Sequence, residues 1–145
     1  MRRIGITGGI GSGKSVVSRL LRIMGYSVYD TDSEAKRLME SSLEVVQKLS
    51  ECFGRDIYHN GRLNRGLLSS RVFGKSDKIV LLNSIVHPVV RFDFYRWSES
   101  LNEEICFVES AILYESRFDE LVDEVWTVTA PEELRISRVR QRSGL

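Results

Sequence analysis

The chain has 145 residues, of which 42% are hydrophobic and 28% charged, a composition typical of one globular domain with one sizeable core. Its 21 basic and 20 acidic residues give a formal net charge of +1, so no overall field favours nucleic acid or a membrane surface as a partner. Cys52 and Cys106 form no C-x-x-C pair, which excludes a disulfide framework and a recognisable zinc site, and we expect both thiols to be buried.

The N-terminus enters a predicted strand almost at once, and no apolar run has the length of a signal peptide or a membrane span. With two unpaired cysteines, these features predict a protein of the reducing cytosol. We favour a monomer.

A glycine-rich stretch follows the first predicted strand, residues 3–7. Residues 8–15 have the sequence G-G-I-G-S-G-K-S, which fits the phosphate-loop pattern G-x-x-x-x-G-K-[ST] and precedes a predicted helix over residues 16–24. Glycines let several backbone N–H groups converge on an anion, and the helix N-terminus adds its dipole. The G-x-G-x-x-G spacing of a dinucleotide-binding turn is absent. The stretch therefore predicts a nucleoside triphosphate site made by Gly9, Ile10, Gly11, Ser12, Gly13, Lys14, Ser15 and Val16.

Two side chains of the loop have chemical roles of their own. Lys14 offers a point charge to the β- and γ-phosphates, and the hydroxyl of Ser15 is a ligand for the Mg²⁺ that bridges them. The helix that follows carries Val16, Val17, Leu20, Leu21 and Met24 at helical spacing, so we expect this stripe to lie against a sheet.

The second predicted strand, residues 26–29, ends in two acids, Asp30 and Asp32. Because strands and helices alternate, the sheet is predicted to be parallel, with these acids and the phosphate loop at the same carboxyl edge. Asp32 has two interpretations. Within the capping box T-x-x-E of Thr31 and Glu34 it would only favour a helix N-terminus. As a carboxylate facing the phosphates it would accept or orient the proton of an attacking hydroxyl, with Asp30 supporting it or lying near Mg²⁺.

Residues 33–101 are predicted to be mostly helical. Residues 56–63, with Asn60-Gly61 at their centre, predict a small hairpin or loop, and a helix that Asn64 caps follows. A later helix, residues 77–86, is expected to end before Pro88. Such an insertion is longer than a sheet crossover needs, which suggests a cap over an acceptor substrate.

Arg65 and His87 are the candidate acceptor-binding residues of this insertion. Each also fits an ordinary role, because a helical arginine is usually solvated and a lone histidine before proline is usually a cap or a satisfied polar group.

A fully apolar run, residues 105–108, predicts a buried strand, and Glu109 follows it. An acid at this position is typical of one that acts on Mg²⁺ through water. Residues 125–129 predict a further parallel strand, and the last predicted helix carries Arg135, Arg138, Arg140 and Arg142. These elements predict a three-layer α/β/α fold of the P-loop NTPase class, with a mostly parallel sheet and a helical substrate-binding insertion.

Motifs along the whole chain resemble the dephospho-CoA kinase family in order and spacing. They are residues 6–15, Asp30 to Asp32, Gly61 to Arg65, His87-Pro88, Leu113 to Glu115, and Arg138 to Leu145. The resemblance implies that ATP phosphorylates the ribose 3′-hydroxyl of dephospho-CoA to give CoA and ADP, the last step of coenzyme A biosynthesis. ATP would be the co-substrate and Mg²⁺ the cofactor, with no nucleic-acid or membrane partner.

The resemblance also assigns roles to individual residues. Lys14 and Ser15 keep the phosphate and Mg²⁺ roles argued above, and Asp32 falls at the family's catalytic base. Arg65 and His87 fall at motif positions on the acceptor side, and Arg142 at an arginine of the ATP lid.

The implied organisation is a single kinase domain with a core of about residues 1–32 and 104–145 and an insertion of about residues 33–103. The lid would begin near residue 138 and be incomplete, because family members continue through the rest of the lid, a final strand and an adenine-contacting loop. Three alternatives remain: a P-loop kinase for a nucleoside monophosphate or sugar acid, a GTPase-type switch, and a folded but inactive fragment. The switch requires an N-K-x-D motif, which these residues lack.

Overall fold

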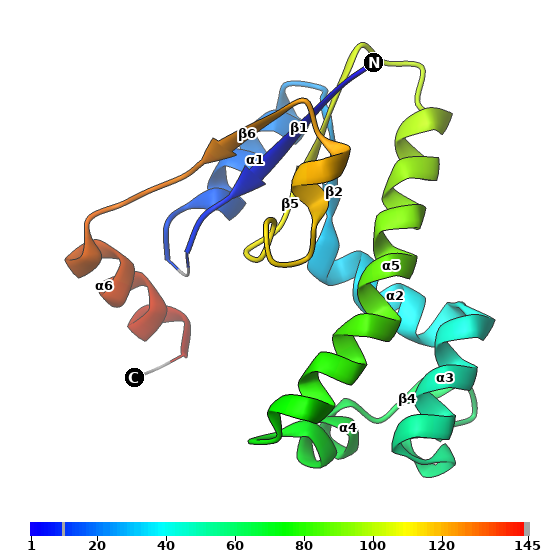
Figure 1. Ribbon diagram of the computed structural model, residues 1–145. Helices are drawn as coiled ribbons and strands as arrows, with labels where there is room; N and C mark the ends of the chain where they lie inside the picture. Colours follow the sequence, from blue (N-terminus) through cyan, green and yellow to red (C-terminus); the bar gives the residue numbers. More distant parts are fainter. Residues whose placement is uncertain (10, 144–145) are drawn as a thin grey trace. The chain divides into compact units, whose positions relative to one another are not determined.

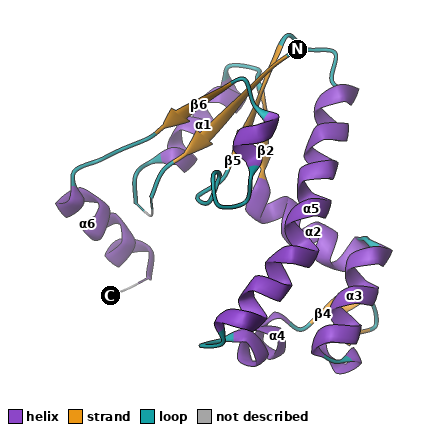
Figure 2. Cartoon of the chain, in the orientation of Figure 1, coloured by secondary structure: helices purple, strands orange, loops and turns teal. Residues whose placement is uncertain are grey.

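The computed structural model describes residues 1–9 and 11–143, with side chains described through residue 141. It divides into two compact units, the first made of residues 1–31 and 94–145 and the second of residues 32–93. Figure 2 shows that the longer strands belong to the first unit, whereas the second is mostly helical. Within the described ranges no helix is long and apolar enough to cross a membrane.

A parallel sheet forms the centre of the first unit (Figure 1). Its strands are β1 (Arg2–Thr7), β2 (Ser27–Asp30), β5 (Ile105–Glu109) and β6 (Glu124–Thr127), in the order β2-β5-β1-β6. All three pairings are parallel, as the alternation of strands and helices predicts. Asp30 and Ile6 both pair with Glu109 in register, so the carboxyl ends of three neighbouring strands meet at one edge.

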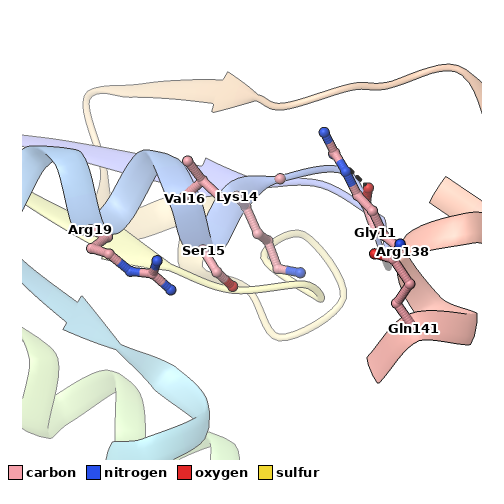
Figure 3. Close-up of a pocket in the computed structure, with 8 residues that line it drawn as sticks. Gly11, Lys14, Ser15, Val16, Arg19, Arg138 and Gln141 are labelled. Atoms are coloured by element: carbon pink, nitrogen blue, oxygen red, sulfur yellow. Dashed lines mark hydrogen bonds between the residues drawn. The ribbon is translucent and has the colours of Figure 1, made fainter. Parts of the chain in front are cut away.

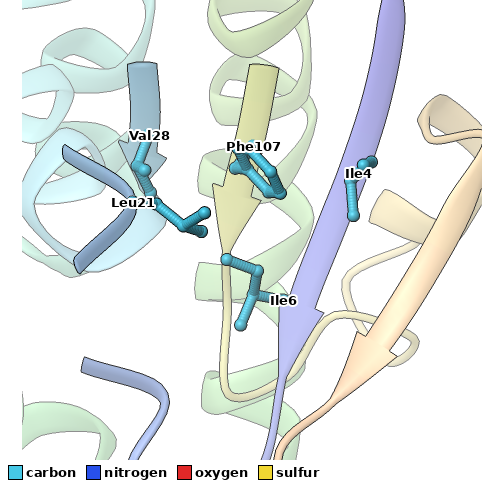
Figure 4. Packing of buried hydrophobic residues seen from close by; sticks show 5 residues of the cluster. All are labelled: Ile4, Ile6, Leu21, Val28 and Phe107. Carbon is cyan, nitrogen blue, oxygen red and sulfur yellow. The ribbon is translucent and has the colours of Figure 1, made fainter. Parts of the chain in front are cut away.

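Helices cover both faces of this sheet. On one face, Leu21 of α1 (Lys14–Ile23) belongs to a buried cluster with Ile4, Ile6, Val28 and Phe107 (Figure 4). Because side chains alternate along a strand, Tyr29 points to the opposite face. There its ring lies 5.3 Å from that of Phe94 in α5 (Ser76–Ser100), and Phe94 also contacts Phe118. The three-layer α/β arrangement expected from the sequence is therefore present.

The apolar stripe predicted for α1 lies against the sheet only in part. Val16, Leu20 and Met24 are 54%, 54% and 69% exposed, whereas Leu21 is buried and Val17 packs partly against the cluster. Ser18, which is polar but fully buried, precedes Leu21 by three residues, so the buried face of α1 includes a polar side chain. The apolar pattern was thus wider than the face that the sheet covers.

The second unit consists of short helices and a hairpin. Its helices include α3 (Leu43–Phe53) and α4 (Arg65–Val72), together with most of α2 (Thr31–Ser41), and a 3-10 turn covers Arg55–Ile57. The predicted hairpin is present as the antiparallel pair β3 (Tyr58–His59) and β4 (Arg62–Leu63). The predicted cap of α4 is confirmed as well, because the Leu67 N–H donates to Asn64 Oδ1 at 3.0 Å.

The prediction that a helix ends before Pro88 is wrong. Residues 76–100 form one helix, α5, with Pro88 inside it. Proline in a helix interior removes one backbone hydrogen bond and costs about 3 kcal/mol. Burial of Val86, Val90 and Phe94 along the same helix offsets that cost, since each fully buried apolar side chain contributes roughly 1.5–3 kcal/mol.

The two cysteines lie in different environments. Cys106 on β5 is buried as predicted, and burial raises the pKa of its thiol to about 11. Cys52 is exposed, contrary to the prediction. It lies on α3 between the buried Leu49 and Phe53, on a part of the helix surface that turns to solvent. Both thiols are free.

The C-terminal helix of the first unit is α6 (Glu132–Ser143), which follows β6. The Arg135 N–H donates to the Pro131 carbonyl at 3.0 Å, so the first turn of the helix forms directly after the proline. This fits the preference of proline for helix starts, where its missing N–H is not needed.

Candidate functional site

The glycine-rich loop joins β1 to α1 at the carboxyl edge of the sheet. Its own backbone closes it, because the Ser12 N–H donates to the Gly9 carbonyl at 3.1 Å. The N–H groups of Val16 and Val17 both donate to the Gly13 carbonyl, which starts α1 at Lys14. The first N–H groups of a helix have no partner within it, so this helix start is suited to an anion.

Gly11 is the point at which α6 approaches the loop. Its φ is +77°, and a β-carbon there would lie 2.5 Å from the Arg135 carbonyl oxygen. Any side chain would therefore clash with the backbone of α6. At the same place Arg138 Nη1 donates to the Gly11 carbonyl at 3.0 Å, so helix and loop are joined by a hydrogen bond between distant parts of the chain.

A cavity of about 330 Å³ lies beside the loop. Its lining comes from the loop (Gly11, Gly13), from α1 (Lys14, Ser15, Val16, Arg19) and from α6 (Arg138, Gln141), as Figure 3 shows. Three of these side chains are cationic and none is acidic. A concave site with this lining is suited to a polyanion such as a triphosphate.

Two oxygen ligands lie together at the edge of the sheet. Glu109, the last residue of β5, is only 8% exposed, and its Oε1 accepts from Ser15 Oγ at 3.5 Å. Hydroxyl and carboxylate oxygens are the ligands that Mg²⁺ prefers, and it commonly takes one or two from the protein and others from phosphates or water. Across the described residues no group of three or more His, Cys, Asp or Glu side chains could hold a metal ion by itself.

Thr31 fixes the chain immediately before Asp32. Its hydroxyl donates to the Glu109 backbone carbonyl at 2.8 Å, and Thr31 is itself buried. Helix α2 begins at Thr31, and its first turn contains Asp32 and Glu34, where negative charge stabilises a helix N-terminus. Asp32 lies in the exposed first turn of α2 and is the first residue of the second unit.

Arg65 and His87 both belong to the second unit. Arg65 opens α4, where its guanidinium donates to the Lys36 carbonyl at 3.3 Å and lies 3.7 Å from Glu40. His87 is partly buried within α5. Burial, and to a lesser extent the charge of Arg91, lowers the pKa of His87 below its usual value.

The predicted site residues fall into three groups. The first unit brings Gly9, Gly11, Ser12, Gly13, Lys14, Ser15, Val16 and Glu109 to its carboxyl edge and the adjoining loop. Asp32, Arg65 and His87 belong to the second unit. Ile10 and the side chain of Arg142 lie outside the described residues, although the backbone of Arg142 is part of α6.

Sequence reasoning missed Arg19 and Gln141 and gave Arg138 no individual role. The position of Arg19 had a signal in the sequence, because it follows Ser15 by four residues and so shares its face of α1. The position of Gln141 had none, since the contact of α6 with the loop depends on tertiary structure.

The amino-acid sequence is similar to those of known proteins over almost its whole length. The sequence profile of the dephospho-CoA kinase family matches residues 2–145. The dephospho-CoA kinase of Porphyromonas gingivalis is 47% identical over 144 residues, which cover 99% of this chain and 71% of that protein. That of Corynebacterium diphtheriae is 41% identical over 149 aligned positions, covering 100% of this chain and 74% of its own length.

Solved structures agree at the level of the fold. The protein TT1252 from Thermus thermophilus superposes with a TM-score of 0.82 at 38% identity, covering 99% of this chain and 73% of that one. The dephospho-CoA kinase from Campylobacter jejuni gives 0.72 at 23% identity, covering 100% and 75%, and shares the fold.

The parallel sheet, the loop and the cationic cavity define a P-loop protein, and the named relatives make it a kinase, that is, a phosphotransferase. The match over residues 2–145 and the identity of 47% to a named relative go further: the chain belongs to the dephospho-CoA kinase family.

Proposed function

We propose that the chain transfers the γ-phosphoryl group of ATP to the ribose 3′-hydroxyl of dephospho-CoA, giving CoA and ADP. The observation that carries this proposal is the complete phosphate loop beside a cavity with three cationic side chains, in a chain that matches the family from residue 2 to residue 145. Phosphoryl transfer needs little covalent chemistry from a protein, and depends on positioning and on neutralising charge.

Residues of the first unit act on the donor. The loop N–H groups and the start of α1 hold the phosphates, and Lys14 neutralises charge that moves onto the β-γ bridging oxygen as the bond breaks. Ser15 and Glu109 would hold Mg²⁺, which when bound would supply positive charge that stabilises the same developing charge. The 3.5 Å contact of Ser15 with Glu109 fits a site where Ser15 is a direct ligand and Glu109 acts through water.

Residues of the second unit act on the acceptor. Asp32 accepts or orients the proton of the attacking 3′-hydroxyl, and Arg65 and His87 bind dephospho-CoA. Arg142 belongs to the lid and adds positive charge at the transferring group. In this proposal residues 1–145 form one kinase domain, with a core of about residues 1–32 and 104–145, an acceptor-binding insertion of about residues 33–103, and a lid that begins near residue 138.

We infer a cytoplasmic location, which suits an enzyme with two free thiols. The enzyme is expected to act as a monomer without a nucleic-acid or membrane partner.

Acceptor-dependent ADP formation tests the proposal. The protein is incubated with ATP and Mg²⁺ and with dephospho-CoA, AMP, adenosine or a sugar acid, and ADP is measured for each acceptor. Dephospho-CoA is expected to be the acceptor that stimulates turnover, with a new 3′-phosphomonoester seen by phosphorus NMR. Stimulation by another acceptor in its place would reject the substrate, and acceptor-independent GTP hydrolysis would favour a nucleotide switch.

A further inference from the structure

The cavity beside the phosphate loop contains one cation that the proposed reaction does not yet use. Lys14 serves the donor phosphates, and Arg138 is joined to the Gly11 carbonyl. Arg19 also lines the cavity, but it has no hydrogen bond or ion pair with any residue that the structure describes. Its guanidinium is therefore available to a ligand.

The position of Arg19 on α1 directs it to the site. It follows Ser15 by four residues, so the two side chains leave the helix on the same face, about 6 Å apart along its axis. Figure 3 shows both side chains on the same side of α1, with the guanidinium of Arg19 extended in the direction of Ser15, and both residues line the cavity. An arginine side chain is long enough to reach a phosphate group held near Ser15.

Several other arginines of the first unit already have partners. Arg2, Arg3 and Arg117 form ion pairs with Glu124, Glu99 and Glu120. Arg22, one turn further along α1 than Arg19, donates to the Val28 carbonyl at 3.2 Å. Because the formal net charge of the chain is only +1, three cations without a lining carboxylate make the cavity a local concentration of positive charge.

We propose that Arg19 is a substrate-binding residue whose guanidinium contacts a phosphate group in this cavity. The proposal rests on the kinase function proposed above and adds a residue to it. Guanidinium groups bind phosphate oxygens through two parallel N–H bonds, which fix orientation as well as charge. Two substrates carry such groups, ATP in its triphosphate and dephospho-CoA in its diphosphate, and the experiment separates them.

The variants Arg19→Ala and Arg19→Lys test the proposal, with Arg140→Ala as the matched control. Arg140 is an exposed arginine of α6 that does not line the cavity, so its loss changes the net charge equally. Calorimetry measures the Kd of ATP and of dephospho-CoA separately for each protein, and steady-state kinetics measure both KM values and kcat. Thermal unfolding confirms that every variant is folded.

Loss of a charged hydrogen bond is expected to weaken binding of one substrate by roughly tenfold in Arg19→Ala. Arg19→Lys should recover part of the affinity, since it keeps the charge but not the paired N–H bonds, and Arg140→Ala should match the wild type. A higher Kd for ATP alone assigns Arg19 to the donor, and a higher Kd for dephospho-CoA alone assigns it to the acceptor.

Unchanged affinity for both substrates in a folded Arg19→Ala protein would overturn the proposal. So would an equal loss in Arg140→Ala, because the effect would then belong to net charge. If the wild type binds ATP but shows no turnover with dephospho-CoA, the proposed reaction fails, while the ATP affinities of the variants still decide the role of Arg19.

Discussion

The phosphate loop and the second unit hold their candidate residues in different ways. In the loop, the same residues satisfy the fold and the chemistry: Gly11 leaves room for α6, and Lys14 both starts α1 and faces the cavity. In the second unit, a candidate such as Arg65 already has partners in Lys36 and Glu40. Its contacts explain its place in the fold without any substrate.

This difference between the loop and the second unit determines how strongly the structure by itself indicates a function for the candidate residues of each. Where neighbouring atoms leave no room for a side chain, only glycine fits, so another sequence cannot form a loop of the same shape. The sequence pattern of such a loop therefore indicates one kind of chemistry. An arginine on a helix fits many proteins. Predictions for the second unit must therefore separate a role in binding from a role in folding.

The largest effect is expected for Asp32→Asn, which keeps the size of the side chain and removes its charge. If Asp32 accepts or orients the proton of the acceptor hydroxyl, kcat should fall by about 10²- to 10⁴-fold. The Kd of ATP should be almost unchanged, because the donor phosphates bind to residues of the first unit. Rapid-quench measurement of a single turnover, together with calorimetric ATP binding, checks both parts.

The variant Lys14→Ala is compared with Asp32→Asn because the two should differ in their effect on ATP binding. It should weaken ATP binding as well as turnover, since Lys14 contacts the phosphates in the ground state and in the transition state. Wild-type turnover in Asp32→Asn would contradict the catalytic role and leave Asp32 as a residue that only stabilises the N-terminus of α2. Loss of ATP binding in that variant would show that it disturbs the loop and not the acceptor.

A smaller effect, on the loop itself, is expected for Gly8→Ala, with Gly9→Ala as its control. A β-carbon at Gly8 would lie 2.5 Å from both the Val128 carbonyl oxygen and Ser12 Oγ, and a backbone carbonyl cannot move freely. At Gly9 the nearest atom is the mobile Arg135 Nη1 at 3.3 Å.

Strain of about 1–3 kcal/mol at Gly8 should weaken ATP binding roughly 5- to 150-fold, whereas Gly9→Ala should stay within a few-fold of wild type. Fluorescence titration with a labelled nucleotide measures both. Equal affinities for the two variants would show that the loop is less constrained than its close contacts indicate.

Much of the fold was predictable because its determinants are local. Buried parallel strands are short apolar runs, so residues 2–7 and 105–109 were recognisable, and the Asn60-Gly61 turn and the Asn64 cap follow from single side chains. Local rules failed where packing decided the outcome. Pro88 lies inside α5, and Val16 and Leu20 face solvent, because which side of a helix the sheet covers is a property of the whole unit.

The sequence predicted the candidate residues on the loop and at the strand end, but it did not predict the contacts that α6 makes with the loop. The loop pattern gave Lys14 and Ser15, and the strand end gave Glu109, which lies 3.5 Å from Ser15; that the two share a metal ion stays a prediction. The bond from Arg138 to Gly11 joins residues 127 positions apart, and no sequence period indicates such a contact. The lining of the cavity by Gln141, also on α6, depends on tertiary structure in the same way.

A more modest effect is expected for Arg65→Ala, with Arg71→Ala as its control on the same helix. Arg71 makes a two-point contact with Asp56 at 2.7 and 2.6 Å and lowers the pKa of that carboxyl, whereas the contacts of Arg65 are 3.3 and 3.7 Å long. Looser contacts leave Arg65 free to bind an anionic acceptor. Its loss should raise the KM of dephospho-CoA roughly tenfold, with ATP binding and the unfolding midpoint little changed.

Arg71→Ala should show the opposite pattern, with a lower unfolding midpoint and unchanged KM values for the fraction that is folded. Steady-state kinetics and urea unfolding on both proteins measure the contrast. If Arg65→Ala lowers the unfolding midpoint and leaves KM alone, Arg65 belongs to the fold and not to the acceptor site.

The smallest effect is expected from the titration of His87. Its pKa in the folded protein is lowered by burial, and secondarily by Arg91, so the unfolded chain binds the proton more readily. The neutral imidazole therefore contributes stability that is complete above the unfolded pKa of about 6.5 and is lost as pH falls toward the lower folded value. Urea midpoints at pH 7.5 and 5.5 should differ more in the wild type than in His87→Gln.

The same variant tests the binding role of His87. A higher KM of dephospho-CoA with an unchanged pH dependence of unfolding would assign His87 to substrate binding. A smaller pH dependence with an unchanged KM would make it a residue of the fold, as its burial in α5 alone suggests.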